Sequence, residues 1–212
     1  LVRTRTALSN EIRGLLDEFG IIVPIGITQL RQALPMILEQ TDSGLSTRFK
    51  QLLAELAEEL QQLDERIAVH DKRIQVAARE DERIKRLLEI EGIGPISASA
   101  LVAAVGDAKQ FANGRDMAAW IGLVPRQHSS GGKERLGCIS KRGDTYLRTL
   151  LIHGARAALN AGVAKDDARS RWAQALATRR NRNIATVALA NKNARISWAV
   201  LSRAEAYRRT QQ

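Results

Sequence analysis

The chain has 212 residues, of which 44% are hydrophobic and 4% aromatic, so it can bury a core as one or two domains. Its formal net charge of +10 is unevenly distributed. Residues 125–212 hold 18 Lys and Arg against 5 Asp and Glu, whereas residues 1–124 hold 15 against 18. A basic half joined to a near-neutral half points to a polyanionic partner, nucleic acid above all. The alternative is a basic surface that only keeps the protein soluble.

The composition also excludes several kinds of site. Cys138 is the only cysteine, so the chain has neither an internal disulfide framework nor a Cys-rich zinc site. His70, His128 and His153 lie far apart without the spacing of metal ligands, and we assign no metal ligand to this chain. No apolar run is long enough for a membrane span, and no signal peptide opens the chain. We therefore expect a cytoplasmic, prokaryotic protein associated with the nucleoid.

The N-terminal part is expected to be helical. Residues 1–19 have the pattern of a basic amphipathic helix, residues 21–25 that of a short extended piece, and residues 27–40 that of a second helix bent near Pro35. The apolar stripe of the first helix is already under way at Leu1, so we expect the chain to be a fragment with protein sequence before it.

Residues 45–90 contain neither Gly nor Pro and predict one long helix. Apolar positions recur along it at alternating steps of four and three, which is the seam of a coiled coil. The positions on this seam are Leu56, Leu60, Leu63, Ile67, His70, Ile74 and Ala77. Such a helix cannot bury its stripe alone. A second subunit is the favoured partner, and folding back onto residues 1–40 is the alternative.

The segment after the long helix resembles a helix-hairpin-helix motif. A helix ends at Gly92, Ile93 and Gly94, and Pro95 occupies the first turn of the next helix. In that motif the backbone N–H groups of the hairpin meet a DNA phosphate without reading the sequence. The simpler interpretation is a tight pair of helices that only pack together.

Further helices are expected at residues 111–123, 145–160, 168–176 and 183–203. Met117, Trp120 and Ile121 are expected to face a core, and Trp172 and Trp198 to be core anchors and not platforms for stacked bases.

Residues 125–142 predict a loop with a short hairpin around residues 133–139. A Ser129-Ser130 pair runs into two glycines, which allow another backbone to approach closely. Cations surround these serines, and we expect them to bind phosphate: Arg126, Lys133, Arg135, Lys141, Arg142 and Arg148. A hydroxyl in such a setting can meet a phosphodiester. The alternative is a solvated loop whose serines cap a turn.

The order of these segments resembles the insertion-sequence transposases of the DEDD type, the RNA-guided "bridge" recombinases. The resemblance covers nearly the whole chain. It is carried by "LVRTRTALSNEIRGLLDEFGI", the coiled coil, "IEGIGPISASALVAAVGD" and "AAWIGLVPRQHSSGGKERLGCISKRGDTYLRTLLIHGARAAL". The run from GLVP through SSGGK to GDTYLR is the specific part.

The resemblance implies a mainly α fold with a long coiled-coil helix and a helical transposase domain. Residues 1–44 would follow a RuvC-like domain whose four acidic residues bind Mg²⁺, residues 45–90 would be the coiled coil, and residues 91–212 the transposase domain. The acidic tetrad should lie upstream of Leu1. The family's nucleophilic serine matches Ser130, and no cofactor is expected in this chain itself.

The resemblance further implies DNA cleavage and strand exchange through a 5′-phosphoserine, with double-stranded DNA, a guide RNA and further copies of the chain as partners. Two alternatives remain open. Tyr146, followed by His153 and Arg156, is the rival nucleophile of a tyrosine recombinase. The chain could also be a non-catalytic helix-hairpin-helix module for DNA binding and oligomerisation.

Overall fold

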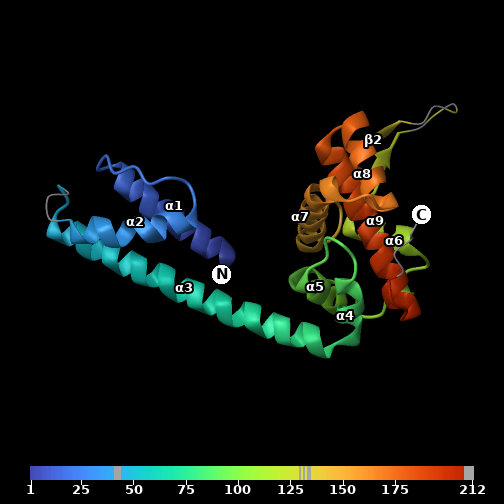
Figure 1. The fold of residues 1–212 in the computed structure, drawn as a ribbon, viewed down its shortest axis with the longest axis horizontal. Coiled ribbons are helices and arrows are strands. Elements are labelled where there is room, and N and C mark those ends of the chain that lie inside the picture. Colours follow the sequence, from blue (N-terminus) through green and yellow to red (C-terminus); the bar gives the residue numbers. More distant parts are fainter. Residues whose placement is uncertain (41–43, 129, 131, 133–134, 208–212) are drawn as a thin grey trace. The chain divides into compact units, whose positions relative to one another are not determined.

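The computed structural model describes residues 1–40, 44–128, 130, 132 and 135–207. These residues are mainly helical and contain a two-stranded antiparallel sheet (Figure 1), so the predicted fold class is confirmed. The chain divides into two compact units, Leu1–Arg73 and Ile74–Gln212. Each unit has its own hydrophobic core and is described by itself.

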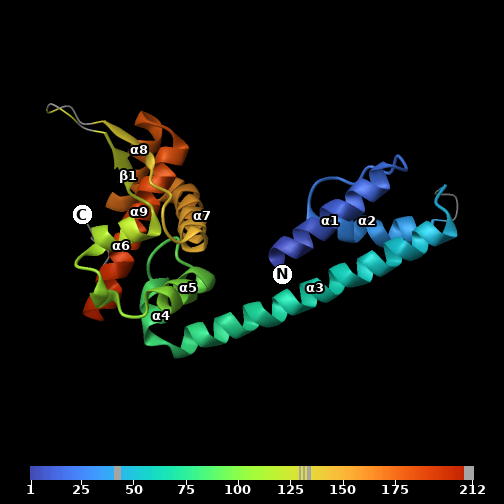
Figure 2. The same cartoon turned by 180° about the vertical axis from the view of Figure 1, so that it is seen from behind.

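The first unit combines α1 (Val2–Asp17), α2 (Ile27–Glu39) and the larger part of α3 (Thr47–Glu80). Its core takes apolar side chains from all three helices: Leu8, Ile12, Leu16, Leu30, Leu34, Ile37, Leu53, Leu60 and Leu63. Figure 2 shows α1 and α2 alongside the N-terminal part of α3. Residues 1–40 therefore fold back onto α3 within the same chain.

Polar and aromatic contacts reinforce this arrangement. The carboxylate of Asp64 on α3 bridges two helices, because Arg5 on α1 lies 3.1 Å from one oxygen and Arg31 on α2 pairs with the other. Beyond the end of α1, the rings of Phe19 and Phe49 stack with their centroids 4.2 Å apart. The first half of the seam is thus already occupied. For Leu60 and Leu63 the expectation of a partner subunit is wrong, and the intramolecular alternative is correct.

The predicted single helix at residues 45–90 is wrong at Asp81. Helix α3 ends at Glu80, and α4 (Glu82–Leu88) begins after an extended residue. Asp81 has φ −91° and ψ 114°, and its carboxylate accepts a hydrogen bond of 2.8 Å from the backbone N–H of Arg83. An aspartate side chain can accept hydrogen bonds from backbone N–H groups and is favoured at an N-cap. Asp81 therefore ends α3 and begins α4, although neither Gly nor Pro is present.

We expect Asp81→Ala to lower the free energy of unfolding by about 1 kcal/mol at pH 7, the usual contribution of an N-cap. The side chain of Arg83 and then the backbone N–H groups at the cap lower the pKa of Asp81 from 3.8 to about 2. A carboxylate whose pKa is lowered by folding stabilises the folded protein at pH values above the pKa of that group in the unfolded chain. The difference between the proteins should therefore shrink as the pH falls from about 4 to about 2. Urea unfolding at several pH values measures this, with Asp71→Ala in the middle of α3 as the control.

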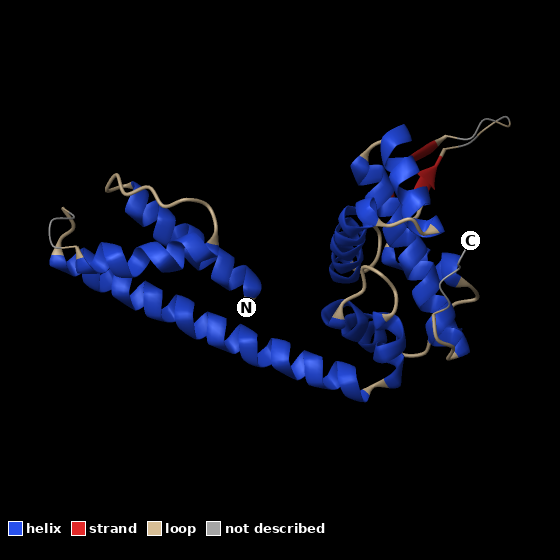
Figure 3. Cartoon of the chain, in the orientation of Figure 1, coloured by secondary structure: helices blue, strands red, loops and turns tan. Residues whose placement is uncertain are grey.

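In the second unit α9 (Arg182–Arg203) is the central helix. It packs against α4, α6 (Gly114–Ile121), α7 (Thr145–Ala161) and α8 (Ala168–Arg179), while α5 (Pro95–Val105) packs against α4 and α7. Short 3-10 helices at Ala108–Gln110 and Gly162–Ala164 join these elements. Figure 3 shows the two strands of this unit among its helices.

The tryptophans divide between core and surface. The indole N–H of Trp198 donates to the carbonyls of Ala108 and Phe111, at 3.1 and 3.3 Å, so the expectation of a core anchor is confirmed there. Trp120, expected to face a core, and Trp172, expected to be a core anchor, keep 38% and 39% of their surface exposed, so neither expectation is met. The buried positions of their helices carry smaller side chains: Gly114, Met117, Ala118 and Ile121 on α6, and Ser170 and Ala173 on α8.

Candidate nucleic-acid interface

The serine loop connects two short paired strands. Strands β1 (Pro125–Gln127) and β2 (Leu136–Ile139) are antiparallel, with Pro125 opposite Ile139 and Gln127 opposite Leu136. The pairing therefore begins earlier than the hairpin expected around residues 133–139. Ser130, the predicted nucleophile, lies exposed in the connection between the strands.

Gly132 and Ser130 are the described residues between Gln127 and Arg135 on which the prediction depends. Gly132 has φ +74° and open space around it, so this backbone position favours glycine. Ser129, Gly131 and the predicted phosphate contact Lys133 lie outside the described residues. What the structure adds to the prediction is that Ser130 is presented to solvent by a paired hairpin.

The base of the hairpin is fixed by close backbone approaches. A Cβ on Gly122 (φ +81°) would lie 2.0 Å from the carbonyl oxygen of Arg142, and one on Gly143 (φ +95°) would lie 1.8 Å from that of Trp120. The backbone N–H of Lys141 donates to the carbonyl of Gly122 at 3.2 Å. Only glycine fits at positions 122 and 143, so the end of α6 holds the start and the end of the hairpin together.

Arg148 takes part in the same junction from α7. Its guanidinium donates to the carbonyl of Ile121 at 3.0 Å and to the hydroxyl of Thr145 at 3.0 Å, and the residue is 8% exposed. The expectation that Arg148 contacts DNA does not agree with this burial. Its charge satisfies the C-terminal end of α6, where a helix carries partial negative charge.

The other predicted cations of the loop are accessible. Arg126, Arg135, Lys141 and Arg142 are exposed on and beside the two strands. Arg126 donates to the carbonyl of Ser140 across the hairpin at 3.3 Å, and the carbonyl of Arg135 accepts from the backbone N–H of His128 at 2.9 Å. These four residues can contribute positive charge on the hairpin that carries Ser130.

The turn between α4 and α5 is packed against α7. Gly92 has φ +86°, and a Cβ there would lie 2.6 Å from the carbonyl oxygen of Gly154; a Cβ on Gly154 would lie 1.8 Å from the carbonyl oxygen of Gly92. Ile93 is 4% exposed, and Gly94 is exposed at the start of α5. Of the three residues predicted to contact DNA here, Ile93 is buried, Gly92 is half-buried against Gly154, and Gly94 is exposed.

A buried polar network fixes the same turn from the other side. The amide of Asn193, a fully buried residue on α9, donates to the carbonyl of Glu91 at 3.0 Å. Arg169 on α8 donates to that carbonyl at 2.9 Å and also to the Asn193 side chain. The ammonium of Lys165 pairs with the Glu91 carboxylate at 2.8 Å. The pair of helices α4 and α5 is therefore rigidly docked on α7, α8 and α9.

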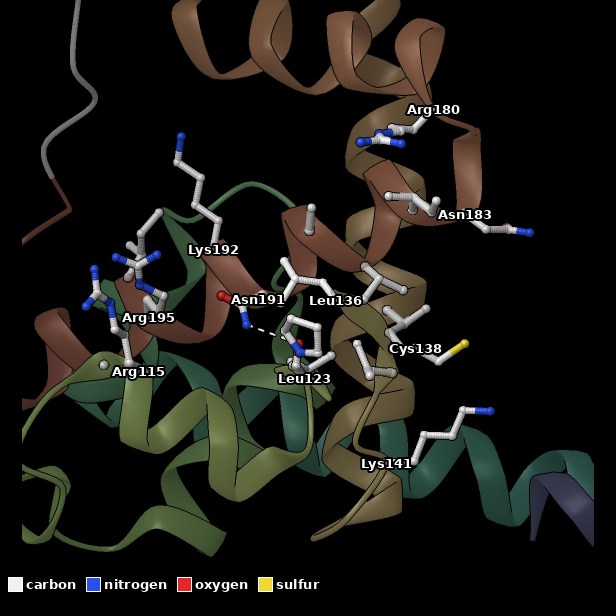
Figure 4. Close-up of a pocket in the computed structure, with 18 of the residues that line it drawn as sticks. Arg115, Leu123, Leu136, Cys138, Lys141, Arg180, Asn183, Asn191, Lys192 and Arg195 are labelled. Atoms are coloured by element: carbon white, nitrogen blue, oxygen red, sulfur yellow. Dashed lines mark hydrogen bonds between the residues drawn. The ribbon is translucent and has the colours of Figure 1, made fainter. Parts of the chain in front are cut away.

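A large groove opens beside the hairpin. Its volume is about 1620 Å³, and it lies between the two strands, the start of α6, and helices α8 and α9. Five cations line it: Arg115, Lys141, Arg180, Lys192 and Arg195. Among its described lining residues there is no Asp or Glu. We call this feature the basic groove. Figure 4 shows Arg115 beside Arg195 on one side of it and Lys141 on the other.

Four of these five cations were not predicted as site residues. They come from α6, the C-terminal end of α8 and α9, and a spacing such as that of Lys192 and Arg195 is common on any solvated helix face. Close packing creates the cluster, because a Cβ on Gly114 would lie 3.0 Å from the Cα of Arg195, which brings the start of α6 against α9. The amide of Asn191 donates to the carbonyl of Leu123 at 3.1 Å and ties α9 to the root of the hairpin.

The electrostatics of the basic groove favour an anion. Burial, followed by the positive charges of Arg169 and Arg195, lowers the pKa of Lys192. Within the part of the chain that is described, no ion pair joins any of the five groove cations to a carboxylate. A bound phosphate would relieve this repulsion between like charges.

The described residues offer neither a cluster of metal ligands nor a membrane-spanning helix. No group of three or more His, Cys, Asp or Glu side chains could hold a metal ion, so the described residues do not fit the magnesium site implied for a RuvC-like domain. No described helix is long and apolar enough to cross a membrane.

Comparison with known proteins finds similarity to transposases of insertion sequences. Residues 84–173 match the family described as "Transposase IS116/IS110/IS902 family". The chain is also 59% identical over 213 residues to a "Probable family 20 transposase" of Pseudomonas aeruginosa, a match that covers 98% of this chain and 62% of the relative. Residues 84–173 are therefore similar to the transposases of this family.

Other transposases of insertion sequences are similar over almost the same range. The transposase for insertion sequence element IS1111A of Coxiella burnetii is 50% identical over 208 residues, 98% of this chain and 57% of the relative. The transposase for insertion sequence element IS1328 of Yersinia enterocolitica is 38% identical over 205 residues, 94% of this chain and 59% of the relative. The chain thus spans less than two thirds of the length of these relatives. The matched family domain contains the turn at Gly92, the hairpin and Ser130.

Proposed function

We propose that this chain is the DNA-binding part of a transposase that moves an insertion sequence by DNA cleavage and strand exchange, with Ser130 as the nucleophile. The observation that carries the proposal is that one family domain, residues 84–173, contains both the hairpin with the exposed Ser130 and much of the cationic surface around it. The relatives named as transposases support the general role.

In the proposed reaction the hydroxyl oxygen of Ser130 attacks the phosphorus of a DNA phosphodiester. A bond from phosphorus to the serine oxygen forms, the bond from phosphorus to the 3′ oxygen breaks, and the strand leaves with a free 3′-hydroxyl. The 3′-hydroxyl of another strand then attacks the 5′-phosphoserine, releases the serine and completes the exchange. The serine proton must pass to a base, because a neutral hydroxyl is a weak nucleophile.

The cations of the hairpin supply the electrostatic part of this chemistry. Arg126, Arg135, Lys141 and Arg142 are exposed near the strands, and positive charge stabilises the phosphate oxygens as charge develops on them. Arg148 contributes indirectly, because it fixes the junction of α6 and α7 from which the hairpin projects. A RuvC-like domain with Mg²⁺ and a guide RNA are proposed as parts of the complete protein.

The first expected result is that this chain binds duplex DNA without sequence preference and with strong salt dependence, because Lys and Arg side chains displace the counterions of phosphates. Titration of two unrelated duplexes at low and moderate salt measures this. Replacing Arg126 and Arg135 together with Ala should weaken binding to both duplexes alike and reduce the salt dependence. Equal binding at both salt concentrations would contradict an electrostatic mode.

We also propose that the chain self-associates through α3 beyond the core of the first unit. Ile67 follows Leu63 on the seam and is only half-buried within its own chain. Ile67→Asp should therefore convert an oligomer into a monomer by light scattering, because an unpaired charge in such a seam is strongly destabilising. The matched control is Val69→Asp, an apolar-to-acidic change off the seam at a residue that is 48% exposed. A wild-type monomer would contradict the proposal.

The alternative is a non-catalytic helix-hairpin-helix module for DNA binding and oligomerisation. The exposed Gly94 at the start of α5 favours it, because a helix N-terminus binds phosphate. The close approach of Gly92 to Gly154 and the buried Ile93 favour packing as the role of that turn. The two functions differ in their dependence on Ser130, since a binding module has no need of its hydroxyl.

A further inference from the structure

The basic groove combines two surfaces of different character. Five cations line it, and apolar side chains from β2 and α9 line it as well: Leu136, Ile139, Ile184 and Val187. The cations alone are sufficient to bind phosphates. Apolar walls become useful when the ligand also exposes the flat faces of unpaired bases.

An aromatic ring lies at the same place. Trp172 on α8 lines the groove and is 39% exposed, and the ammonium of Lys192 on α9 lies 4.5 Å from the centroid of its ring. The ammonium lies over one face of the ring, so a base can stack only on the opposite face, and the ammonium can hold the adjoining phosphate. Asparagine amides from Asn181, Asn183 and Asn191 also line the groove, although Asn191 is engaged with the carbonyl of Leu123 (Figure 4).

We propose that the basic groove holds an unpaired nucleic-acid strand, with a base stacked on Trp172 and the adjoining phosphates bound by Lys192 and Arg195. The inference rests on the proposed function and specifies a substrate for it: a strand whose bases are not paired, next to the hairpin that carries Ser130. Strand exchange requires such strands, because a cut strand must leave one partner before it is joined to another.

A duplex fits this groove less well than a single strand. Paired bases are stacked on one another, so a duplex offers phosphates to the cations but no base face to Trp172. Both DNA and RNA strands have the chemistry that the groove recognises. The choice between them depends on whether the 2′-hydroxyl is tolerated.

The test measures binding of the 212-residue chain to fluorescein-labelled oligothymidylate by anisotropy, with oligouridylate and a dA·dT duplex of equal length as the other probes. Trp172→Ala should weaken binding of the single strand about tenfold, and Trp172→Phe should retain most of it because a ring remains. Replacing Lys192 and Arg195 with Ala should reduce the slope of log Kd against log salt by about 1.4, the expectation for two phosphate contacts on a single strand.

Two matched variants act as controls. Trp120→Ala removes an indole of nearly equal exposure, 38%, that does not line the groove, and Arg156→Ala removes an exposed arginine of α7 outside it. Both should bind the single strand as the wild type does, and circular dichroism should show that every variant is folded.

The possible results separate cleanly. Dependence on Trp172 with either single strand supports the inference, and the tighter of the two identifies the sugar. Equal loss in the Trp120 and Trp172 variants, no loss in either, or a preference for the duplex would overturn it. Those results leave the role of Ser130 untouched, because that role is measured by strand exchange.

Discussion

Ser130→Ala is expected to abolish strand exchange while leaving DNA binding nearly unchanged. The substitution removes the only atom that the proposed covalent step requires from this residue, and one neutral hydroxyl adds little to an interface in which phosphate contacts dominate. Ser130 is exposed between β1 and β2, so its truncation creates no cavity and the fold should be retained. The expected loss of activity is to background, with a change in duplex affinity of less than about threefold.

The experiment needs a transposase of full length that contains this chain, because the chain spans 62% of its Pseudomonas aeruginosa relative. Product formation from donor and target DNA is measured in the presence of the guide RNA that the resemblance implies. Ser140→Ala is the control, since it changes a serine at the base of the same hairpin whose backbone makes the contacts to Arg126 and Val124. Full exchange by the Ser130→Ala protein would remove the serine mechanism and favour the non-catalytic module.

Gly154→Ala is expected to have the largest effect on stability. The new Cβ would lie 1.8 Å from the carbonyl oxygen of Gly92, so α7 and the turn between α4 and α5 would have to move apart. Overpacking of a rigid contact between two backbones should cost about 3 kcal/mol or more. The loss should appear in urea unfolding monitored by circular dichroism, which reports both units, and by tryptophan fluorescence, since Trp120, Trp172 and Trp198 all lie in the second unit.

Gly14→Ala is the matched control for this prediction. Gly14 is also a helical glycine, but nothing lies within 4 Å of the position that its Cβ would occupy. Alanine is favoured over glycine in an open helix, so this variant should gain up to about 1 kcal/mol. A Gly154→Ala protein as stable as the wild type would show that the turn is not held against α7 by this contact.

The helical fold could be predicted because it depends on local patterns. Apolar spacing and turn residues identify the helices, and the coarse outcome agrees with the structure. The element that packs against a given helix face could not be predicted in the same way. Leu60 and Leu63 have the same spacing whether α1 and α2 or a second subunit covers them, so the sequence pattern alone does not decide between the two.

The candidate site shows the same division. The run from Arg126 to Lys141 could be identified because its serine, glycines and cations are contiguous. The buried role of Arg148 could not, because only tertiary packing brings the carbonyl of Ile121 to its guanidinium. The basic groove joins residues of β2, α6, α8 and α9, and Trp172 belongs to it through the position of α8, not through any local pattern.

The most direct measurement of the central claim is the mapping of a trapped covalent adduct. A suicide DNA substrate that loses its cut strand should leave the complete transposase joined to a 5′-phosphate, and peptide mapping by mass spectrometry identifies the modified residue. The account predicts an adduct on Ser130, absent from the Ser130→Ala protein and present at wild-type level in the Ser140→Ala control. An adduct on Ser129 or Tyr146 would contradict it.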